Sequence, residues 1–408
     1  MKVLYFHQHF TTPSLGGAVR SYEFAKRLVQ RGHQVTMVTG NSSGYFNLPQ
    51  TAQKNIYRGI IDGIDVIQIA IPYSNNDGIM KRVLSFLKFA WKSIQFAMHE
   101  EYDIAYSTTT PLTAGIPVIW AKWFRGKKYV FEVRDLWPEL PKAMGMKNPL
   151  LILCMDILEK LSYANAVACV ALAPGIKDGI ARRLQKKKEI AMIPNGCDLD
   201  LFSPGQRCDL KIEGVCITDT VAVFSGAHGL ANGLDSVLDA AKIILDKGRK
   251  DIKFVFIGNG KLKPMLVNRA KNERIDNCIF LDHMPKAELS SILCRADIGL
   301  QILANIPAFY YGTSPNKFFD YITAGRPVFN NYPGWLADII IENDCGLVVE
   351  PNNPVAFADG IIYMADHPEF RRKWGENARN LAEREFDRNR LGTQFVDLLE
   401  KYHRMQNL

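Results

Sequence analysis

Short apolar runs of strand length alternate with helical segments along almost the whole chain. The first unit has a strand over Lys2–Phe6, a glycine-containing loop, a helical stretch that ends at Gly32, and a second strand over His33–Thr39. Strands that alternate with helices in this way form parallel sheets covered by helices. A polar, turn-rich stretch over Gly205–Thr220 separates two such series. The sequence therefore predicts an α/β protein with two doubly wound, Rossmann-like domains.

The composition is that of a globular protein with a moderate basic charge. Of the 408 residues, 47% are hydrophobic and 23% are charged, and the net charge of +8 favours anionic partners. The charge is spread along the chain without a basic patch interleaved with aromatic residues, so we expect no nucleic-acid partner. The eight cysteines form no C-x-x-C pair or Cys/His cluster, which argues against a zinc site or a disulfide framework.

Two features indicate where the protein works. The first residues hold too few apolar side chains for a secretory signal, and no uncharged apolar run reaches the roughly 18 residues of a membrane span. Scattered cysteines without a disulfide pattern fit a reducing compartment. We therefore expect a cytoplasmic protein that does not span a membrane.

The stretch Gly312–Pro327 carries strong start and stop signals for a short helix between two strands. Ser314 is predicted as the N-cap and Pro315 as the first helical residue, where its missing N–H has no cost. The helix should run to about Ala324 and stop at Gly325. The stretch thus predicts a helix whose N-terminus lies at the carboxyl end of a parallel sheet.

The start of this helix is a predicted anion site. Free N–H groups at Asn316, Lys317 and Phe318 attract negative charge. Asp320 lies on the same side of the helix and would repel a phosphate, so a pair of hydroxyl groups suits it better. A ribose diol beside a diphosphate has this layout. The alternative is that Lys317 and Asp320 form an ordinary ion pair within the helix.

The same stretch resembles a family signature. Asp320, followed after four residues by Gly-Arg-Pro-Val, is similar to the second half of the E-x7-E motif of family 4 retaining glycosyltransferases. In that family the second acid holds the nucleotide ribose, which implies this role for Asp320. Gly312 stands where the first acid would be. The following Thr-Ser-Pro-Asn-Lys looks like the branch that builds bacterial O-antigen, capsule and colanic acid.

The resemblance covers nearly the whole chain and implies the GT-B fold, in which two Rossmann-like domains enclose a cleft. It implies an N-terminal acceptor domain over residues 1–204 and a C-terminal nucleotide-sugar donor domain over residues 205–385. A final helix over residues 386–408 should pack back on the N-terminal domain. Asn195–Pro204 resembles the segment that closes the first domain in this family.

The loop after the first strand also matches the family. Gly16, Gly17 and Arg20 reproduce a Gly-Gly loop followed by arginine, which in the family lies between the donor phosphate and the acceptor. Alone this signal is weak, because glycines are common in loops. Together with the Asp320 motif it implies that these three residues help to bind the nucleotide sugar.

The loops of the second half depart from the family in part. Most members carry an arginine and a lysine that neutralise the diphosphate, whereas this chain has His228 and Asn232 in the corresponding loop. The phosphate role then moves to Lys317, with Lys261 and Arg326 as weaker candidates. The resemblance and the predicted helix start place further donor contacts at Gly258, His283, Met284, Ser314 and Asn316.

A polar cluster follows the predicted strand over Lys127–Val133. Arg134 and Asp135 stand where the family often carries a histidine, at the carboxyl end of a parallel strand, where such sheets bind ligands. We interpret both as catalytic residues, with Asp135 orienting or deprotonating the acceptor hydroxyl. The alternative is that Asp135 caps the next helix.

The segment Ile79–Met98 is a predicted basic amphipathic helix with many aromatic residues and no acid. Its polar positions trace one narrow stripe, formed by Lys81, Ser85, Lys88, Lys92, Gln95 and His99. We expect it to contact an anionic membrane surface. The alternative is a helix docked on the sheet whose lysines simply face water.

The implied reaction transfers a sugar, an N-acetylated hexosamine or a deoxyhexosamine, from a UDP-sugar to a saccharide on a polyprenyl diphosphate. The anomeric configuration is retained and no metal or other cofactor is required. Helix N-termini, glycine-loop amides and Lys317 would then stabilise the leaving diphosphate. The pair Asp198 and Asp200 invites a metal interpretation, but its Gly/Pro-rich surroundings favour turn and cap roles.

Two other functions remain open from the sequence. A UDP-sugar 2-epimerase shares the fold but needs additional acids and histidines, for which His7, His9 and His228 are the candidates. A nucleotide-binding regulator without catalysis is suggested by the missing first acid at Gly312. Sugar transfer, epimer formation and binding without product distinguish the three.

Overall fold

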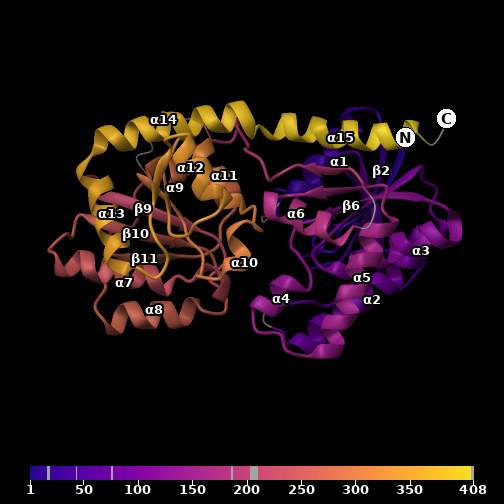
Figure 1. The fold of residues 1–408 in the computed structure, drawn as a ribbon, viewed down its shortest axis with the longest axis horizontal. Coiled ribbons are helices and arrows are strands. Elements are labelled where there is room, and N and C mark those ends of the chain that lie inside the picture. Colours follow the sequence, from indigo (N-terminus) through magenta and orange to yellow (C-terminus); the bar gives the residue numbers. More distant parts are fainter. Residues whose placement is uncertain (16–18, 43, 75–76, 185–186, 203–209, 406–408) are drawn as a thin grey trace. The chain divides into compact units, whose positions relative to one another are not determined.

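Figure 1 shows the computed structural model of the chain, which describes residues 1–15, 19–42, 44–74, 77–184, 187–202 and 210–405. The chain divides into two compact units. Unit 1 comprises Met1–Pro194, Gly312–Ser314 and Asn389–Leu408, and unit 2 comprises Asn195–Tyr311 and Pro315–Arg388. Each unit contains a mainly parallel sheet with helices on both faces, as the alternating pattern predicts.

The sheet of unit 1 has the strand order β3-β4-β2-β1-β5-β6-β7-β8, and every neighbouring pair is parallel except β3 and β4. Because its central strands are buried on both faces, they read as continuous apolar runs. The strands are β1 (Lys2–Phe6), β2 (Gln34–Thr39), β3 (Ile56–Ile61), β4 (Ile64–Ile69), β5 (Ile104–Thr108), β6 (Lys128–Val133), β7 (Ala168–Ala171) and β8 (Ile190–Met192).

Helices cover both faces of this sheet, with α1 and α15 on one side and α2, α3 and α5 on the other (Figure 1). The ring of Phe395 in α15 stacks on Phe24 of α1 at 4.4 Å and meets Tyr106 of β5 at 4.8 Å, so the last helix completes the core of unit 1. The helices are α1 (Arg20–Gln30), α2 (Ile79–His99), η1 (Leu112–Ala114), α3 (Gly115–Arg125), α4 (Glu139–Ala143), α5 (Pro149–Asn165), α6 (Pro174–Arg183) and α15 (Arg388–Arg404).

The register of the central strands brings polar residues together at the carboxyl edge of this sheet. Phe6 of β1 pairs with Ser107 of β5, and Thr108 of β5 pairs with Glu132 of β6. The residues that follow each strand therefore lie at one edge, and they include His7 and Arg134. Ligands of open parallel sheets bind at this edge.

The sheet of unit 2 has the order β11-β10-β9-β12-β13-β14, and all its pairs are parallel. Its strands are β9 (Thr220–Ser225), β10 (Ile252–Ile257), β11 (Cys278–Leu281), β12 (Ile298–Gln301), β13 (Val328–Asn330) and β14 (Gly346–Val348). Its helices are η2 (Leu230–Asn232), α7 (Asp235–Asp246), α8 (Lys263–Asn272), α9 (Lys286–Arg295), α10 (Pro307–Tyr310), α11 (Asn316–Thr323), α12 (Trp335–Glu342), α13 (Pro354–Asp366) and α14 (Pro368–Glu385).

Two of the segments at which the chain passes between the units are bound to each other within unit 2. The backbone N–H of Cys197 donates to the carbonyl of Phe386 at 2.7 Å, and the N–H of Arg388 donates to the carbonyl of Cys197 at 3.1 Å. We call residues 195–198 and 386–388 the crossover segments. The boundary expected after residue 204 lies outside the described residues, and Asn195–Phe202 belongs to unit 2.

Two local predictions need correction. Ser314 does not cap the central short helix. Pro315 occupies the N-cap position with an extended ψ of 131°, and α11 begins at Asn316 without a side-chain cap. In α2, the predicted polar stripe is interrupted, because Ser85 is buried and donates its hydroxyl to the carbonyls of Pro72 and Lys81 at 3.0 Å each.

Candidate active site

Lys317 in unit 2 is buried in the first turn of α11 and has an unusual environment. Its Nζ donates to Asn232 Oδ1 at 2.8 Å and lies 4.1 Å from the centre of the Phe224 ring. Within the described residues Lys317 forms no ion pair, so the alternative of a helical ion pair with Asp320 does not apply. Burial lowers the pKa of the Lys317 amine to about 7, because the charged form loses its hydration. An anionic ligand would restore the favourable environment of the ammonium group.

One glycine loop lies against the Lys317 amine, and a second glycine loop packs against the first. A Cβ on Gly226 would lie 3.1 Å from Lys317 Cε, so the missing side chain leaves the amine room beside the backbone. Gly258 has a φ of +138°, and a Cβ there would lie 2.1 Å from the Gly226 carbonyl oxygen. The loops after β9 and β10 can therefore touch because residue 258 is a glycine.

His228 lies beneath these loops and not on their surface. Its ring is buried between Phe224, Phe256 and Phe280, and neither nitrogen has a hydrogen-bond partner within the described residues. Burial first, and then Lys263 and Lys317, lower the pKa of His228 to about 4. The imidazole is therefore neutral near pH 7, so His228 does not supply the positive charge that the family places in this loop.

Asp320 has a different partner from the one expected. Its Oδ1 lies 2.8 Å from Nζ of Lys286, the first residue of α9, and the same Nζ lies 2.6 Å from Asp198 Oδ2. Arg388 completes the network through its own ion pair with Asp198. Burial raises the pKa of Asp320, and Lys286 opposes this effect. Burial alone would also raise the pKa of Asp198. The positive charges of Arg388 and Lys286 outweigh this effect and lower the pKa of Asp198 to about 2.

The other donor-side candidates differ in exposure. Lys261 and His283 are exposed, whereas Met284, Ser314, Asn316 and Arg326 are partly buried. Ser314 belongs to unit 1, while the other five belong to unit 2. Gly16 and Gly17 lie outside the described residues.

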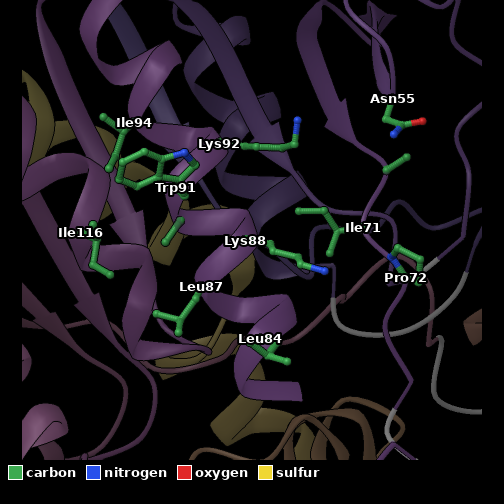
Figure 2. A pocket seen from close by; sticks show the side chains of 12 residues that line it. Asn55, Ile71, Pro72, Leu84, Leu87, Lys88, Trp91, Lys92, Ile94 and Ile116 are labelled. Atoms are coloured by element: carbon green, nitrogen blue, oxygen red, sulfur yellow. The ribbon is translucent and has the colours of Figure 1, made fainter. Parts of the chain in front are cut away.

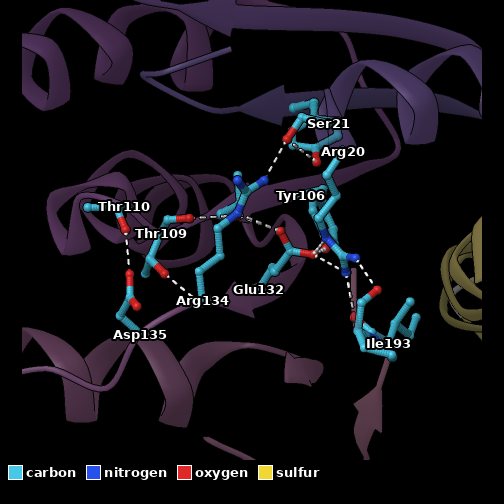
Figure 3. A network of polar contacts seen from close by, with 12 residues as sticks. Arg20, Ser21, Tyr106, Thr109, Thr110, Glu132, Arg134, Asp135 and Ile193 are labelled. Atoms are coloured by element: carbon cyan, nitrogen blue, oxygen red, sulfur yellow. Dashed lines mark hydrogen bonds and ion pairs between the residues drawn. The ribbon is translucent and has the colours of Figure 1, made fainter. Parts of the chain in front are cut away.

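Arg20 in unit 1 belongs to a buried network of ion pairs and hydrogen bonds (Figure 3). Its side chain is 1% exposed and pairs with Glu132 at 2.8 Å. Its guanidinium also donates to the carbonyls of Pro194 at 2.6 Å and Ile193 at 2.7 Å. The donors of Arg20 are thus used inside unit 1, and its expected contact with the nucleotide sugar stays a prediction.

Glu132 is the centre of this network and was not recognised in the sequence, because it lies inside an apolar strand. It accepts hydrogen bonds from Tyr106 at 2.8 Å and Thr108 at 2.6 Å, and it pairs with Arg134 at 3.1 Å. Burial would raise its pKa, but Arg20 and Arg134 reverse the effect and lower the pKa of Glu132 to about 2. The signal that could have identified Glu132 in the sequence is a charged residue within an otherwise apolar strand.

Arg134 and Asp135 follow β6 and face different partners (Figure 3). Nη2 of Arg134 donates to Ser21 Oγ at 2.8 Å, while Nε donates to Thr108 Oγ1 at 2.8 Å. Asp135 Oδ2 accepts from Thr110 Oγ1 at 2.9 Å, and burial raises the pKa of Asp135. Asp135 does not cap the next helix, because the N-cap of α4 is Pro138 and has no side-chain bond.

The histidines after β1 lie near this cluster. His9 Nδ1 is hydrogen bonded to Ser42 Oγ at 2.6 Å, and the His9 ring lies 4.9 Å from that of Tyr73. Burial, followed by the charges of Arg134 and Arg82, lowers the pKa of His9 to about 4. Burial also lowers the pKa of His7. Both rings are therefore neutral near pH 7.

Metal and membrane features are absent from the part of the chain that the structure describes. No group of three or more His, Cys, Asp or Glu side chains there is placed to hold a metal ion. Asp198, the first residue of the Asp-x-Asp pair, forms ion pairs with Lys286 and Arg388. None of the described helices has the length and apolar character needed to cross a bilayer.

Two family models match successive parts of the chain. The model for the glycosyl transferase 4-like domain matches residues 16–196. The model for glycosyl transferases group 1 matches residues 211–381. The two matches correspond closely to the two α/β units, and together they cover most of the chain.

Curated relatives are distant. The D-inositol 3-phosphate glycosyltransferase of Corynebacterium glutamicum (strain R) is 26% identical over 46% of this chain and 46% of its own length. The first relatives are matched over only 46% to 62% of their length. The N-acetyl-alpha-D-glucosaminyl L-malate synthase of Bacillus anthracis is 22% identical over 94% of this chain and 93% of its own.

Solved structures agree in fold over the whole chain. Sucrose-phosphate synthase from Thermosynechococcus elongatus superimposes with a TM-score of 0.78 at 16% identity and covers 98% of both chains. Anabaena Alr3699/HepE in complex with UDP superimposes with a TM-score of 0.73 at 16% identity, over 98% of this chain and 100% of that chain. At this identity the likeness establishes the fold.

Proposed function

The chain belongs to the GT-B glycosyltransferases of family 4, and we propose that it transfers a sugar from a UDP-sugar to a lipid-linked saccharide. The anomeric configuration of the sugar is retained. We assign the transferred sugar to the N-acetylated hexosamines or deoxyhexosamines and the reaction to bacterial surface polysaccharide synthesis. The choice of branch rests on the Thr-Ser-Pro-Asn-Lys stretch at the start of α11.

The observation that carries the proposal is the buried Lys317 amine beside two glycine loops. An amine that forms no ion pair within the described residues, next to backbone that glycine keeps open, suits a diphosphate. The N–H groups of the first turn of α11 add to the same attraction. As the sugar leaves UDP, negative charge develops on the β-phosphate, and these groups stabilise it without a metal ion.

Asp320 is the proposed acceptor for the ribose hydroxyls. It lies three residues after Lys317 in α11, so a nucleotide whose diphosphate meets Lys317 brings its ribose toward the Asp320 carboxylate. We choose UDP among the nucleotides because Anabaena Alr3699/HepE, which shares the fold, is known in complex with UDP and with UDP-glucose.

Asp135 is the proposed group on the acceptor side. It lies after β6 at the carboxyl edge of the unit 1 sheet, and its carboxylate has Oδ1 without a bond to the described residues. Its raised pKa suits a group that accepts a proton from a hydroxyl. Arg134 beside it is held by Ser21 and Thr108 and gives the edge a positive charge.

The exposed face of α2 supports a lipid-linked acceptor (Figure 2). A hollow of about 590 Å³ runs along this helix. All five of the following residues line it: in Figure 2, Leu87, Trp91 and Ile116 lie on one side of α2, and the side chains of Lys88 and Lys92 lie on the other. The Trp91 side chain is 73% exposed. Exposed apolar groups beside lysines are typical of a surface that lies on an anionic membrane.

The neighbouring helix extends this surface. On α3 the large side chains of Trp120, Trp123 and Phe124 are exposed, and α3 packs directly against α2. Tryptophan favours the boundary between lipid and water because it combines an apolar ring with an N–H donor. We therefore propose that the protein is cytoplasmic and meets the inner leaflet through α2 and α3, where its acceptor is a polyprenyl diphosphate saccharide.

A nucleotide panel followed by product analysis tests the proposal. UDP at 100 times its Kd should stabilise the protein by roughly 2.7 kcal/mol, with smaller effects from GDP, ADP and dTDP. A UDP-sugar and a polyprenyl-linked saccharide should then give a product whose new linkage has the anomeric configuration of the donor. Formation of an epimer would instead assign the chain to the 2-epimerases. Tight UDP binding without any product would favour a regulator.

A further inference from the structure

Lys286 connects the proposed ribose site with the crossover segments of unit 2, and no sequence motif marks it. Its ammonium group lies between two carboxylates, 2.8 Å from Asp320 Oδ1 and 2.6 Å from Asp198 Oδ2. Asp320 belongs to α11, whereas Asp198 belongs to the first crossover segment. One lysine therefore holds residues that are separated by 122 positions in the chain.

The two carboxylates do not depend on Lys286 equally. Asp198 has a second cation, because Arg388 pairs with it and also donates to the Gly196 carbonyl at 2.6 Å. Within the described residues Asp320 has Lys286 as its only ion-pair partner, and its side chain is 6% exposed. A buried carboxylate that loses its only cation becomes protonated or distorts the structure around it. Removal of Lys286 should therefore change Asp320 and leave Asp198 paired.

We propose that Lys286 is a positioning residue for the nucleotide, which keeps the Asp320 carboxylate charged and oriented toward the ribose hydroxyls. One carboxylate oxygen, Oδ1, is held by the ammonium group. The other, Oδ2, accepts no hydrogen bond from the described residues and is available to the 2′ and 3′ hydroxyls. The inference rests on the proposed function, because it assumes that the nucleotide ribose binds at Asp320.

The same contact gives Lys286 a second effect. When ribose hydroxyls share the Asp320 carboxylate, Lys286 stays anchored on Asp198, so nucleotide binding should steady the first crossover segment. The Cys197 N–H, which is bonded to the Phe386 carbonyl, reports on this segment. Its protection from hydrogen exchange should rise on UDP binding in the wild type and not in a variant without the Lys286 charge.

The test compares UDP with 2′,3′-dideoxy-UDP by titration calorimetry. In the wild type the two hydroxyls should improve affinity at least about tenfold, as hydrogen bonds to a charged group do. In Lys286→Met this ratio should fall towards one, mainly through weaker UDP binding, while Lys286→Arg should restore most of it. Lys242→Met is the matched control, because Lys242 pairs with Glu273 on the surface of the same unit.

The pH dependence of the preference for UDP over 2′,3′-dideoxy-UDP shows whether Lys286 positions Asp320 or only supports the fold. Burial raises the pKa of Asp320 and Lys286 lowers it. In Lys286→Gln, which removes the charge and keeps a donor, the hydroxyl preference should therefore fall as the pH decreases, whereas in the wild type it should stay constant over the same range. This variant also replaces Lys286→Met if the latter does not fold.

The outcomes distinguish this inference from the proposed function. A wild-type protein that binds UDP and dideoxy-UDP equally would refute the ribose site at Asp320, and Lys286 with it. A wild type that prefers UDP, together with charge-removing Lys286 variants that prefer it to the same degree at every pH, would overturn the role of Lys286 alone.

Discussion

Lys317 carries its charge in surroundings that disfavour it, and this makes nucleotide binding sensitive to pH. The pKa of its amine is about 7 in the free protein, and a bound diphosphate should raise it. UDP binding above pH 7 therefore takes up a proton. From pH 8 to pH 9, where the terminal phosphate of UDP is fully ionised, affinity should fall by up to about tenfold.

Calorimetry in buffers of different ionisation enthalpy measures this proton uptake directly. Lys317→Met should bind UDP more weakly and lose the pH dependence in this range. Lys261→Met provides the comparison, because Lys261 is an exposed cation of the same unit. A Lys317→Met protein that retains the wild-type pH dependence would move the phosphate contact to another cation.

Asp135 should act on turnover and not on nucleotide affinity. Asp135→Asn keeps the shape of the side chain and removes its ability to accept a proton, so kcat should drop about 100-fold or more with UDP affinity nearly unchanged. Burial raises the pKa of Asp135, so wild-type activity should fall as the pH decreases through a value above that of an ordinary aspartate. An equal loss in UDP affinity would show that Asp135 supports the structure.

Glu132 should matter for stability. Glu132→Gln leaves the buried Arg20 guanidinium without its counter-charge, which should lower the free energy of unfolding by about 3–5 kcal/mol. The pKa of Glu132 is lowered from 4.5 to about 2, so this contribution is complete above pH 4.5 and is lost as the pH falls towards 2. Thermal unfolding measures both effects. Glu101→Gln is the control, because the Glu101 side chain is 86% exposed and should leave the melting temperature unchanged.

At the scale of elements, α2 provides the test of membrane contact. Lys88 and Lys92 are exposed and have no ion pair within the described residues. Near an anionic leaflet each contributes about 1 kcal/mol, so Lys88→Glu with Lys92→Glu should move the protein from the vesicle pellet to the supernatant. Co-sedimentation with vesicles of anionic lipid measures the fraction of bound protein, and circular dichroism confirms that the variant is folded.

The control for α2 changes the same charge in unit 2. Lys250 and Lys271 are exposed there, and their replacement by glutamate should leave sedimentation unchanged. If both double variants leave the pellet equally, net charge alone governs binding. If neither does, α2 is a docked helix whose lysines face water.

Elements were easier to predict than their contacts. The strands and helices follow from apolar periodicity and from glycine and proline signals, which act over a few residues. The start of α11 was misplaced by one residue because Pro315 can serve either as N-cap or as first helical residue. For α2 the period indicated a basic amphipathic helix, but only packing decides that Ser85 is buried while Trp91 is exposed.

At the scale of the whole molecule, the two-unit α/β fold could be predicted because both βα series are visible in the sequence. The partners of the site residues could not. Arg20 and Glu132 are 112 residues apart, and Lys286 lies 88 residues from Asp198. Such contacts depend on how distant elements pack, which no local pattern encodes. The glycine loops, Lys317 and Asp320 could be named as candidates from the sequence because their residue types suit a nucleotide, and their role stays a prediction, whereas Glu132 and Lys286 became visible only in the fold.

The central claim is that a nucleotide diphosphate binds at the start of α11, with its ribose on Asp320. The most direct measurement is the affinity of UDP and 2′,3′-dideoxy-UDP for the wild type and for Asp320→Ala. Loss of the carboxylate should weaken UDP binding at least about tenfold, and loss of the hydroxyls should cost the wild type a similar amount. The two losses should not add, because each removes the same contact. Additive losses, or an Asp320→Ala protein that binds UDP like the wild type, would contradict the account.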